Sequence, residues 1–212
     1  MDRRGSPSGI LITRAPRGSL WLLRQETTEV CHAVLQDPAF FRLLLRIDEE
    51  FAAQTRLGGC RRCAGALHSA NYPRKPRGCP ASVRQAYESR FSFTCGRCQK
   101  RATPASVRFL GRRVYLAVVL MLVSPHGGRA QRTLGELLPI APRTLTRWRR
   151  WWSEDFQRTP FWQSVRERFA VAVQIERLPG SLLERFDAAT EGDRMRQLLR
   201  FVSPLSVRPT VK

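Results

Sequence analysis

Two Cys-x-x-Cys pairs constrain the fold of this chain more than any other feature of its sequence. Cys60-Arg-Arg-Cys63 and Cys95-Gly-Arg-Cys98 are separated by 31 residues of mostly basic sequence. Each pair places two thiolates close enough to share one tetrahedral ion, and two pairs at this separation are typical of a four-cysteine zinc site. A redox dithiol is the alternative for either pair alone, but neither lies in the strand-helix-strand setting of a thioredoxin motif. We therefore expect four ligands to one Zn²⁺, namely Cys60, Cys63, Cys95 and Cys98.

The segments beside the two cysteine pairs predict a zinc ribbon. Apolar and polar positions roughly alternate in residues 67–72 and 91–94, as they do in short strands. Residues 73–90, called the insert below, lie between these strands, and residues 81–90 of the insert can form a short helix. Because all four ligands would be cysteines, no position remains for a catalytic water, so we expect the zinc to be structural. Cys79 lies in the insert as a spare cysteine, which is more often inert than a ligand.

The net charge of +20 is concentrated in the same part of the chain. Residues 60–113 hold 13 basic residues and a single acid, Glu88, whereas basic and acidic residues are more evenly mixed elsewhere. Arginine makes up 34 of the 37 basic residues, which a GC-rich coding sequence could explain, but such a bias would not exclude acids from one segment. This concentration of positive charge predicts a polyanionic partner, and nucleic acid is the commonest one.

The apolar content and the helix signals predict a packed, mostly helical protein. Asp37-Pro38 is a helix start, and apolar residues at helical spacing continue to a stop at Gly58-Gly59. Residues 48–50 of this helix, Asp-Glu-Glu, point to different sides and are expected to be solvated.

The apolar run 114–123 is too short for a bilayer crossing of about 20 residues, so we expect a buried helix and no membrane partner. The sequence shows no secretory signal, and its six cysteines include two Cys-x-x-Cys pairs. Both observations predict that the protein is located in the reducing cytoplasm.

A second candidate for function lies in residues 133–152. Residues 133–138 form a brief amphipathic helix, residues 139–142 a tight turn, and residues 143–152 a second helix. In the second helix an apolar face, Leu145, Trp148 and Trp152, opposes a face rich in Arg and Thr. This is the arrangement of a helix-turn-helix, although an ordinary surface helix packed through its apolar face has the same pattern. We expect phosphate contacts from Arg74, Lys75 and Arg77, and base contacts from Arg143, Thr144, Thr146, Arg147 and Arg150.

The expected organisation is α+β and mostly α-helical. A C-terminal helix should start at Pro160 and run to about Gln174, with further helices at 181–186 and 193–202. The predicted divisions are a disordered N-terminus (1–19), a helical lead-in (20–58), the zinc ribbon (59–112), the helix-turn-helix-like region (113–158) and a helical tail (159–212).

Residues 58–152 resemble the N-terminal DNA-binding portion of bacterial insertion-sequence transposases and their small accessory proteins. The likeness rests on the four-cysteine frame and on the helix pair Thr133-Leu-Gly-Glu-Leu-Leu138 and Thr144-Leu-Thr-Arg-Trp148. The runs 72–78 and 103–115 are similar to a group of stand-alone bacterial proteins. The resemblance implies binding to double-stranded DNA within a mobile element, with a separate transposase as a further partner. Transposases of this kind continue into a catalytic domain of well over a hundred residues, and only about sixty follow here.

Two other function classes stay open. A basic ribbon can also dock on structured RNA, with Tyr72, Phe91 and Phe93 stacking on bases. The ribbon could instead be a zinc-stapled scaffold for protein interaction. We do not expect an enzyme, because the chain lacks both the separated carboxylates of a two-metal nuclease core and a His-x-His pair.

Overall fold

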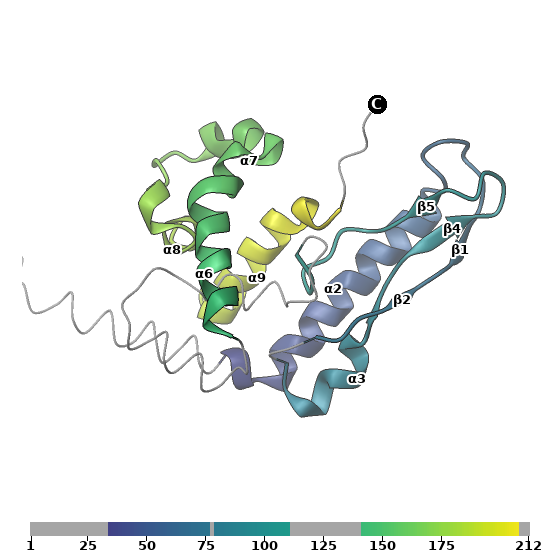
Figure 1. Ribbon diagram of the computed structural model, residues 1–212, viewed down its shortest axis with the longest axis horizontal. Coiled ribbons are helices and arrows are strands. Elements are labelled where there is room, and N and C mark those ends of the chain that lie inside the picture. The colour runs from purple at the N-terminus through teal and green to yellow at the C-terminus, as the bar shows by residue number, and fades with distance from the viewer. Residues whose placement is uncertain (1–33, 77–78, 111–140, 208–212) are drawn as a thin grey trace, which may run out of the picture.

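The computed structural model of this protein describes residues 34–76, 79–110 and 141–207, which combine several helices with two small antiparallel sheets (Figure 1). The fold is therefore mixed α+β and mostly helical, as predicted. Several predictions lie outside the described residues: the disordered N-terminus, the apolar helix 114–123, the first helix of the expected pair (133–138), and the phosphate contact expected of Arg77.

Helix α2 (Pro38–Leu57) confirms the start and stop signals read in the sequence. The Asp37 carboxylate accepts a hydrogen bond from the Ala39 amide at 2.8 Å, and proline occupies the first turn, where no amide is needed. Gly58 caps the other end, and Gly59 then takes a left-handed conformation (φ 67°) that turns the chain into the first cysteine pair.

The strands are shorter than the sequence pattern indicated. Strands β1 (Leu67–Ser69), β4 (Phe93–Cys95) and β5 (Arg101–Ala102) form an antiparallel sheet in the order β1-β4-β5, and β2 (Tyr72–Pro73) pairs with β3 (Ser89–Arg90) in a second sheet. The expected helix 81–90 is confirmed over residues 81–87 and wrong in its last three residues. A 3-10 turn (Ala81–Val83) and helix α3 (Arg84–Tyr87) end before residues 89 and 90, which instead pair with β2.

The C-terminal part is a series of short helices around an aromatic cluster. Its elements are α6 (Pro142–Arg150), a π-helical turn (Trp151–Asp155), a 3-10 turn (Phe156–Arg158), α7 (Pro160–Val165), 3-10 turns at Arg166–Arg168 and Ile175–Arg177, α8 (Gly180–Leu183), α9 (Glu191–Val202) and a 3-10 turn (Ser203–Ser206).

The predicted helix from Pro160 to Gln174 is wrong in length. It ends at Arg168 because Phe169 turns to an extended conformation (ψ 119°). There its ring packs against Phe186 and Phe201, with centroids 6.5 and 5.5 Å away. Tertiary packing of one aromatic side chain outweighs the helical propensity of the residues that follow.

One large hydrophobic core joins segments from the whole described chain. It includes Phe41 of α2, Tyr87 of the insert, Phe109, Trp148 of α6 and Leu198 of α9. The Tyr87 hydroxyl donates to the Phe41 carbonyl at 2.7 Å. A smaller cluster lies between α2 and the cysteine end of residues 59–76 and 79–110, the described part of the predicted zinc ribbon, which is called the ribbon below. It consists of Ala52, Cys60, Leu67, Phe93 and Cys95. The predicted domain boundaries stay a prediction, but the insert and α6 share one core.

Asp48 corrects the expectation that all three acids of α2 are solvated. Its side chain is only 2% exposed and accepts hydrogen bonds from the Ser106 hydroxyl (2.6 Å), the Val107 amide (2.7 Å) and the Arg108 guanidinium (2.7 Å). Arg108 also donates to the Ala86 carbonyl at 2.7 Å. The chain that leaves the ribbon is therefore attached to α2 by a buried ion pair and its hydrogen bonds.

Arg90 performs a similar role between the ribbon and the C-terminal part. Its buried guanidinium donates to the carbonyls of Phe109 (3.3 Å), Pro104 (3.2 Å) and Ser206 (3.0 Å). The ribbon is thus held against both α2 and the end of α9. Across the described ranges, no helix combines the length and apolar character needed to cross a membrane.

Candidate metal centre and basic surface

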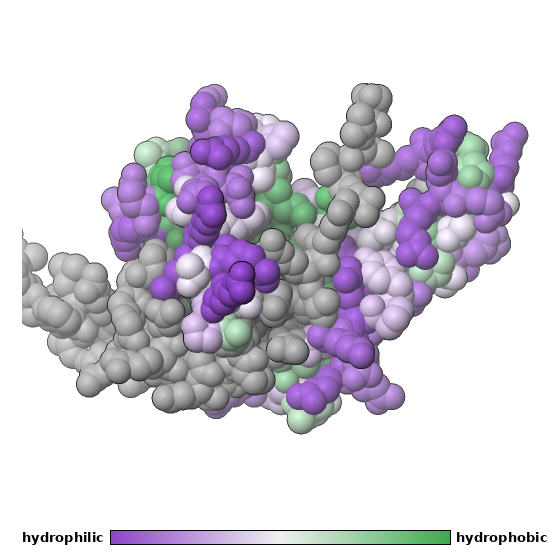
Figure 2. Space-filling model, viewed as in Figure 1, coloured by the Kyte–Doolittle hydropathy of each residue, from purple (hydrophilic) through white to green (hydrophobic). Residues whose placement is uncertain are grey.

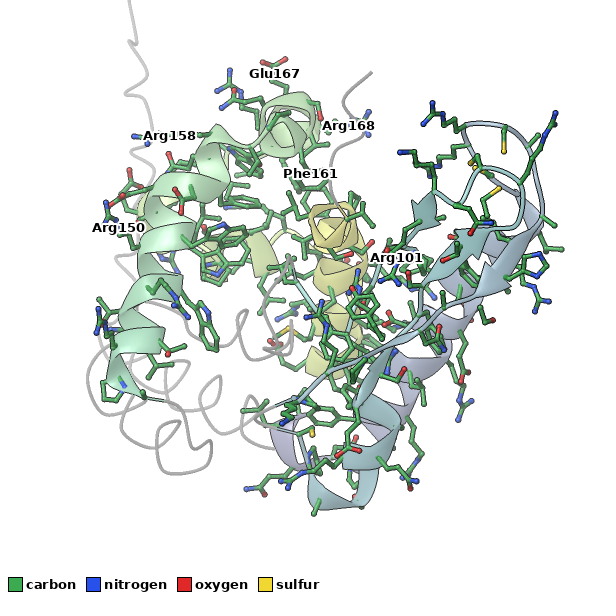
Figure 3. All side chains as sticks on the ribbon, turned by 45° about the vertical axis from the view of Figure 1, so that its right-hand side comes forward. Arg101, Arg150, Arg158, Phe161, Glu167 and Arg168 are labelled. Carbon is green, nitrogen blue, oxygen red and sulfur yellow. The ribbon has the colours of Figure 1, made fainter. Side chains whose placement is uncertain are left out.

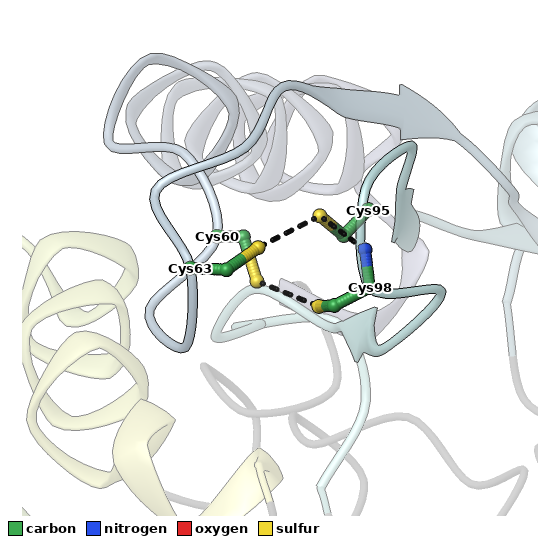
Figure 4. Close-up of side chains that lie close together, drawn as sticks. All are labelled: Cys60, Cys63, Cys95 and Cys98. Atoms are coloured by element: carbon green, nitrogen blue, oxygen red, sulfur yellow. Dashed lines mark hydrogen bonds between the residues drawn. The ribbon is translucent and has the colours of Figure 1, made fainter.

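The structure brings the four predicted ligand cysteines together. Their sulfur atoms all lie within 4.8 Å of one another, and the Cys60–Cys98 and Cys63–Cys95 sulfur pairs are each 3.5 Å apart (Figure 4). These distances exceed the S–S bond of about 2.05 Å, and the four cysteines are free thiols. Cys79 is also free and buried, but it is not part of this group.

Residues 60–65 and 95–100, here called the first and second cysteine loops, have the same backbone design. Two backbone hydrogen bonds close each loop. In one, the carbonyl of the first cysteine accepts from the amide four residues later. In the other, the amide of the first cysteine donates to the carbonyl five residues later. The bonds are Ala64 to Cys60 (2.7 Å) and Cys60 to Gly65 (3.0 Å) in the first loop, and Gln99 to Cys95 (3.0 Å) and Cys95 to Lys100 (3.0 Å) in the second. Ala64 and Gln99 are both left-handed, with φ of 54° and 57°. The two loops therefore present their sulfurs in equivalent ways.

Gly65 allows the two cysteine loops to approach closely. A Cβ atom at this position would lie 3.0 Å from the Cys95 sulfur, 3.0 Å from the Arg97 Cβ and 3.4 Å from the Cys63 sulfur. Any side chain at position 65 would thus press on two of the four sulfurs.

Local hydrogen bonds make the sulfurs unequal as acids. The amides of Cys98 and Arg97 donate to the Cys95 sulfur, each at 3.4 Å, and these bonds lower the pKa of that thiol to about 6. Amides of Arg62 and Cys63 likewise lower the pKa of Cys60. The Gly65 amide lowers the pKa of Cys63, but the neighbouring Cys95 and Cys98 sulfurs outweigh it and raise that pKa to about 11.

The donor set is suited to a metal ion. Four sulfurs from two loops converge without an oxygen or nitrogen ligand, and thiolate sulfur is the donor preferred by soft and borderline metals. At least one sulfur is stabilised as the thiolate near neutral pH, which is the form that binds metal. The structure therefore supports a four-cysteine metal site, as the sequence predicted.

The predicted phosphate-binding residues of the insert lie beside an unexpected arrangement of cations. The Arg74 guanidinium lies 4.6 Å from the centre of the Tyr72 ring and donates to the Tyr72 hydroxyl at 3.1 Å. Arg101 of β5 lies over the same ring at 5.5 Å. Arg74 is half-buried and Lys75 is exposed. Tyr72 of β2 is thus in contact with two arginines, one from the chain after β2 and one from β5.

Helix α6 has the two faces that the sequence indicated. Leu145, Trp148 and Trp152 are buried. Arg143, Thr146, Arg147 and Arg150 are exposed and Thr144 is half-buried. Arg150 pairs with Glu154 at 2.8 Å and projects from the side of α6 away from α9 (Figure 3). The described residues do not include the predicted preceding helix.

The three aromatic residues proposed as base-stacking platforms are already in contact with protein groups. Phe93 is buried, Phe91 is half-buried with the Arg108 guanidinium 5.1 Å from its centre, and Tyr72 carries two guanidiniums.

Sequence reasoning missed four exposed cations at the cysteine end of the ribbon. Arg61 and Arg62 lie between the first two cysteines, Arg97 lies between the second two, and Lys100 closes the second loop. Their signal was present in the sequence, because three of them occupy the x positions of the two Cys-x-x-Cys pairs.

Comparison of the chain with protein-family models, with curated proteins and with solved structures returned no match.

Proposed function

We propose that this protein is a zinc-dependent, duplex-DNA-binding protein in which a zinc ribbon and helix α6 carry the contacts to DNA. The zinc assignment is supported by the distances between the sulfurs. Zn–S bonds of about 2.3 Å in a tetrahedron place the sulfurs about 3.8 Å apart. The observed 3.5 Å for two pairs, within a group spanning 4.8 Å, is close to that spacing. Four cysteine ligands leave no open position, so the ion would be structural.

The single observation that carries the DNA proposal is the division of α6 into a buried aromatic face and an exposed Arg and Thr face. In a helix-turn-helix the second helix enters the major groove and its first turns contact bases. The positions available for this are Arg143, Thr144, Thr146, Arg147 and Arg150. Arg74, Lys75 and Arg77 would contact phosphates, which fix position without reading sequence.

Duplex DNA is favoured over RNA bound through its unpaired bases, because the three aromatic rings predicted to stack on bases are already in contact with protein groups. Recognition of unpaired bases depends on exposed aromatic side chains, whereas Phe93 is buried and guanidiniums lie over Phe91 and Tyr72. A role in a mobile element, with a separate transposase as partner and no catalytic step in this chain, accounts best for these parts together. Free metal-binding thiols also suit the reducing cytoplasm.

The proposal predicts that two groups of arginines differ in selectivity. Replacing Arg143 and Arg147 with Ala should weaken binding to the preferred duplex by about 1 to 3 kcal/mol per lost base contact, and should weaken other duplexes little. Replacing Arg74, Lys75 and Arg77 should weaken all duplexes nearly equally. The measurement is a selection of bound sequences from a random duplex pool with the wild type and both variants.

The same selection can refute the proposal. A wild type that enriches no motif, or a motif unchanged by Arg143→Ala and Arg147→Ala, would rule out sequence reading by α6. Tighter binding to a structured RNA hairpin than to every duplex would replace DNA with RNA as the partner.

A further inference from the structure

The cysteine end of the ribbon carries a concentrated group of exposed cations. Arg61 and Arg62 extend from the first cysteine loop, and Arg97 and Lys100 from the second. The loops are in contact, since a Cβ at Gly65 of the first would lie 3.0 Å from the Arg97 Cβ of the second. The four sulfurs lie within 4.8 Å of one another, and each of these cations is one or two residues from a cysteine. Their backbone positions are therefore close together. We name this set, Arg61, Arg62, Arg97 and Lys100, the cysteine-loop cations.

These side chains point into solvent. Hydrophilic side chains cover the tip of the ribbon, beyond β4 and β5 (Figure 2), and nitrogen-tipped sticks extend outward around the sulfur atoms there (Figure 3). All four cysteine-loop cations are exposed, and none forms an ion pair with any carboxylate of the described ranges. They are therefore available to an external anion.

A general need for solubility does not account for this pattern. Surfaces that need only solubility mix both signs of charge. The C-terminal helices do so, pairing arginines with nearby acids, as in Arg177–Glu184 (2.7 Å) and Arg196–Asp193 (2.7 Å). Around the cysteine loops acids are absent from the sequence, because the only one in residues 60–113 is Glu88 in the insert.

Compensation of the metal site accounts for only part of the charge. Four thiolates around a divalent ion carry a net charge of about −2. Four cations exceed this by about two charges, and their side chains extend away from the sulfurs into water. The excess positive charge therefore has to be matched by solvent ions or by a ligand.

We infer that the cysteine-loop cations form the main phosphate-contact surface of the ribbon, so that the metal end of the ribbon supplies more contacts to the DNA backbone than the insert does. This inference rests on the proposed binding to duplex DNA. Duplex DNA carries one negative charge per about 1.7 Å of its axis, so a cluster of this kind meets several phosphates at once. The metal site then has a second effect, because it holds the two loops together and so fixes the spacing of the four cations.

The test is the salt dependence of duplex binding in the full-length, zinc-loaded protein. A 20-base-pair fluorescent duplex of mixed sequence is titrated between 50 and 200 mM KCl. With about six phosphate contacts, wild-type affinity should fall about a thousandfold over this range. In the variant Arg61→Gln, Arg62→Gln, Arg97→Gln, Lys100→Gln the loss of four contacts should reduce this fall to about tenfold, because each contact contributes about −0.9 to the logarithmic slope.

Two further variants serve as controls. Arg158→Gln, Arg166→Gln, Arg168→Gln, Arg177→Gln removes the same charge from exposed positions of the C-terminal helices and should leave the wild-type slope unchanged. Arg74→Gln with Lys75→Gln removes two insert cations and should change the slope by less per removed charge than the cysteine-loop variant does. Zinc content and the circular dichroism spectrum verify that each variant is folded.

The outcomes separate the inference from the function on which it rests. If the wild type shows the steep slope but the cysteine-loop and C-terminal variants change it equally, the inference is wrong while DNA binding stands. The same holds if the insert variant changes the slope most per removed charge. If the wild type does not bind the duplex, or binds it with a flat salt response, the proposed function fails as well.

Discussion

Asp48 and Arg108 form the one ion pair of the described residues in which both side chains are buried, at 2% and 1% exposed. A buried charge whose partner is removed is left without compensation, which costs about 3–5 kcal/mol. Asp48→Asn keeps the shape of the side chain but removes its charge. It also weakens the hydrogen bonds that this side chain accepts from Ser106, Val107 and Arg108. We therefore predict a loss of about 3–5 kcal/mol in the free energy of unfolding, measured by urea denaturation.

The neighbouring Glu49→Gln is the matched control for Asp48→Asn. Glu49 is exposed, so removing its charge should change stability by no more than about 0.5 kcal/mol. Equal effects of the two substitutions would contradict the role assigned to the buried pair.

Asp48 also shows where reading the sequence is limited. Three consecutive acids on a helix are normally solvated, and nothing near Asp48 in the sequence distinguishes it from Glu49. Its partner Arg108 lies 60 positions away, and only the fold brings the two together. By contrast, the Asp37-Pro38 helix start and the four ligand cysteines could be predicted, because short spacings and local hydrogen bonds determine both.

The same contrast between local and distant causes applies to whole helices. Helix α2 has a cap at each end and was predicted within its bounds. The helix after Pro160 was predicted too long, since Phe169 leaves the helix to pack against Phe186 and Phe201, residues that follow much later in the chain. A helix that ends for tertiary reasons carries no local stop signal.

Helix α6 separates a structural face from a face available to a ligand. Trp148 is 2% exposed, so Trp148→Ala should leave a cavity and lower the free energy of unfolding by about 3–5 kcal/mol. Arg147→Ala, on the exposed face, should lower it by no more than about 0.5 kcal/mol. Thermal or urea denaturation measures both.

The sequence selectivity of DNA binding should change more in Arg147→Ala than in Trp148→Ala, which is the reverse of their effects on stability. Arg147→Ala should alter the motif selected from a random duplex pool, whereas Trp148→Ala should preserve it at temperatures where the variant stays folded. A Trp148→Ala protein of wild-type stability would mean that α6 does not pack through this face.

The ribbon, which carries the cysteine-loop cations at its far end, and helix α6, which carries the second group of exposed cations, both pack into the large hydrophobic core. Tyr87 of α3 and Phe109 after β5, whose ring centroids are 6.2 Å apart, share that core with Trp148 of α6. Arg90 adds hydrogen bonds from the ribbon to Ser206 after α9. The ribbon and α6 are thus held by the same set of contacts. A ligand that contacted both the ribbon and α6 would therefore not lose binding free energy to ordering one relative to the other.

The four-cysteine site is central to this arrangement, because the cluster of Ala52, Cys60, Leu67, Phe93 and Cys95 is small. With the proposed zinc bound, the ion would hold together cysteine loops that so small a core does not stabilise alone. Cys60→Ser and Cys98→Ser should therefore each lose the bound ion, and with it the positions of the cysteine-loop cations.

The most direct measurement is duplex binding by one protein preparation in three states: as purified, stripped of metal with a chelator under reducing conditions, and reloaded with Zn²⁺. Elemental analysis should find one zinc per chain in the first and third states. The account predicts that stripping reduces affinity for a mixed-sequence duplex at 50 mM salt at least tenfold, that Zn²⁺ restores it, and that Mg²⁺ does not. A metal-free protein that keeps a folded ribbon and binds the duplex as tightly as the zinc-loaded protein would contradict the account.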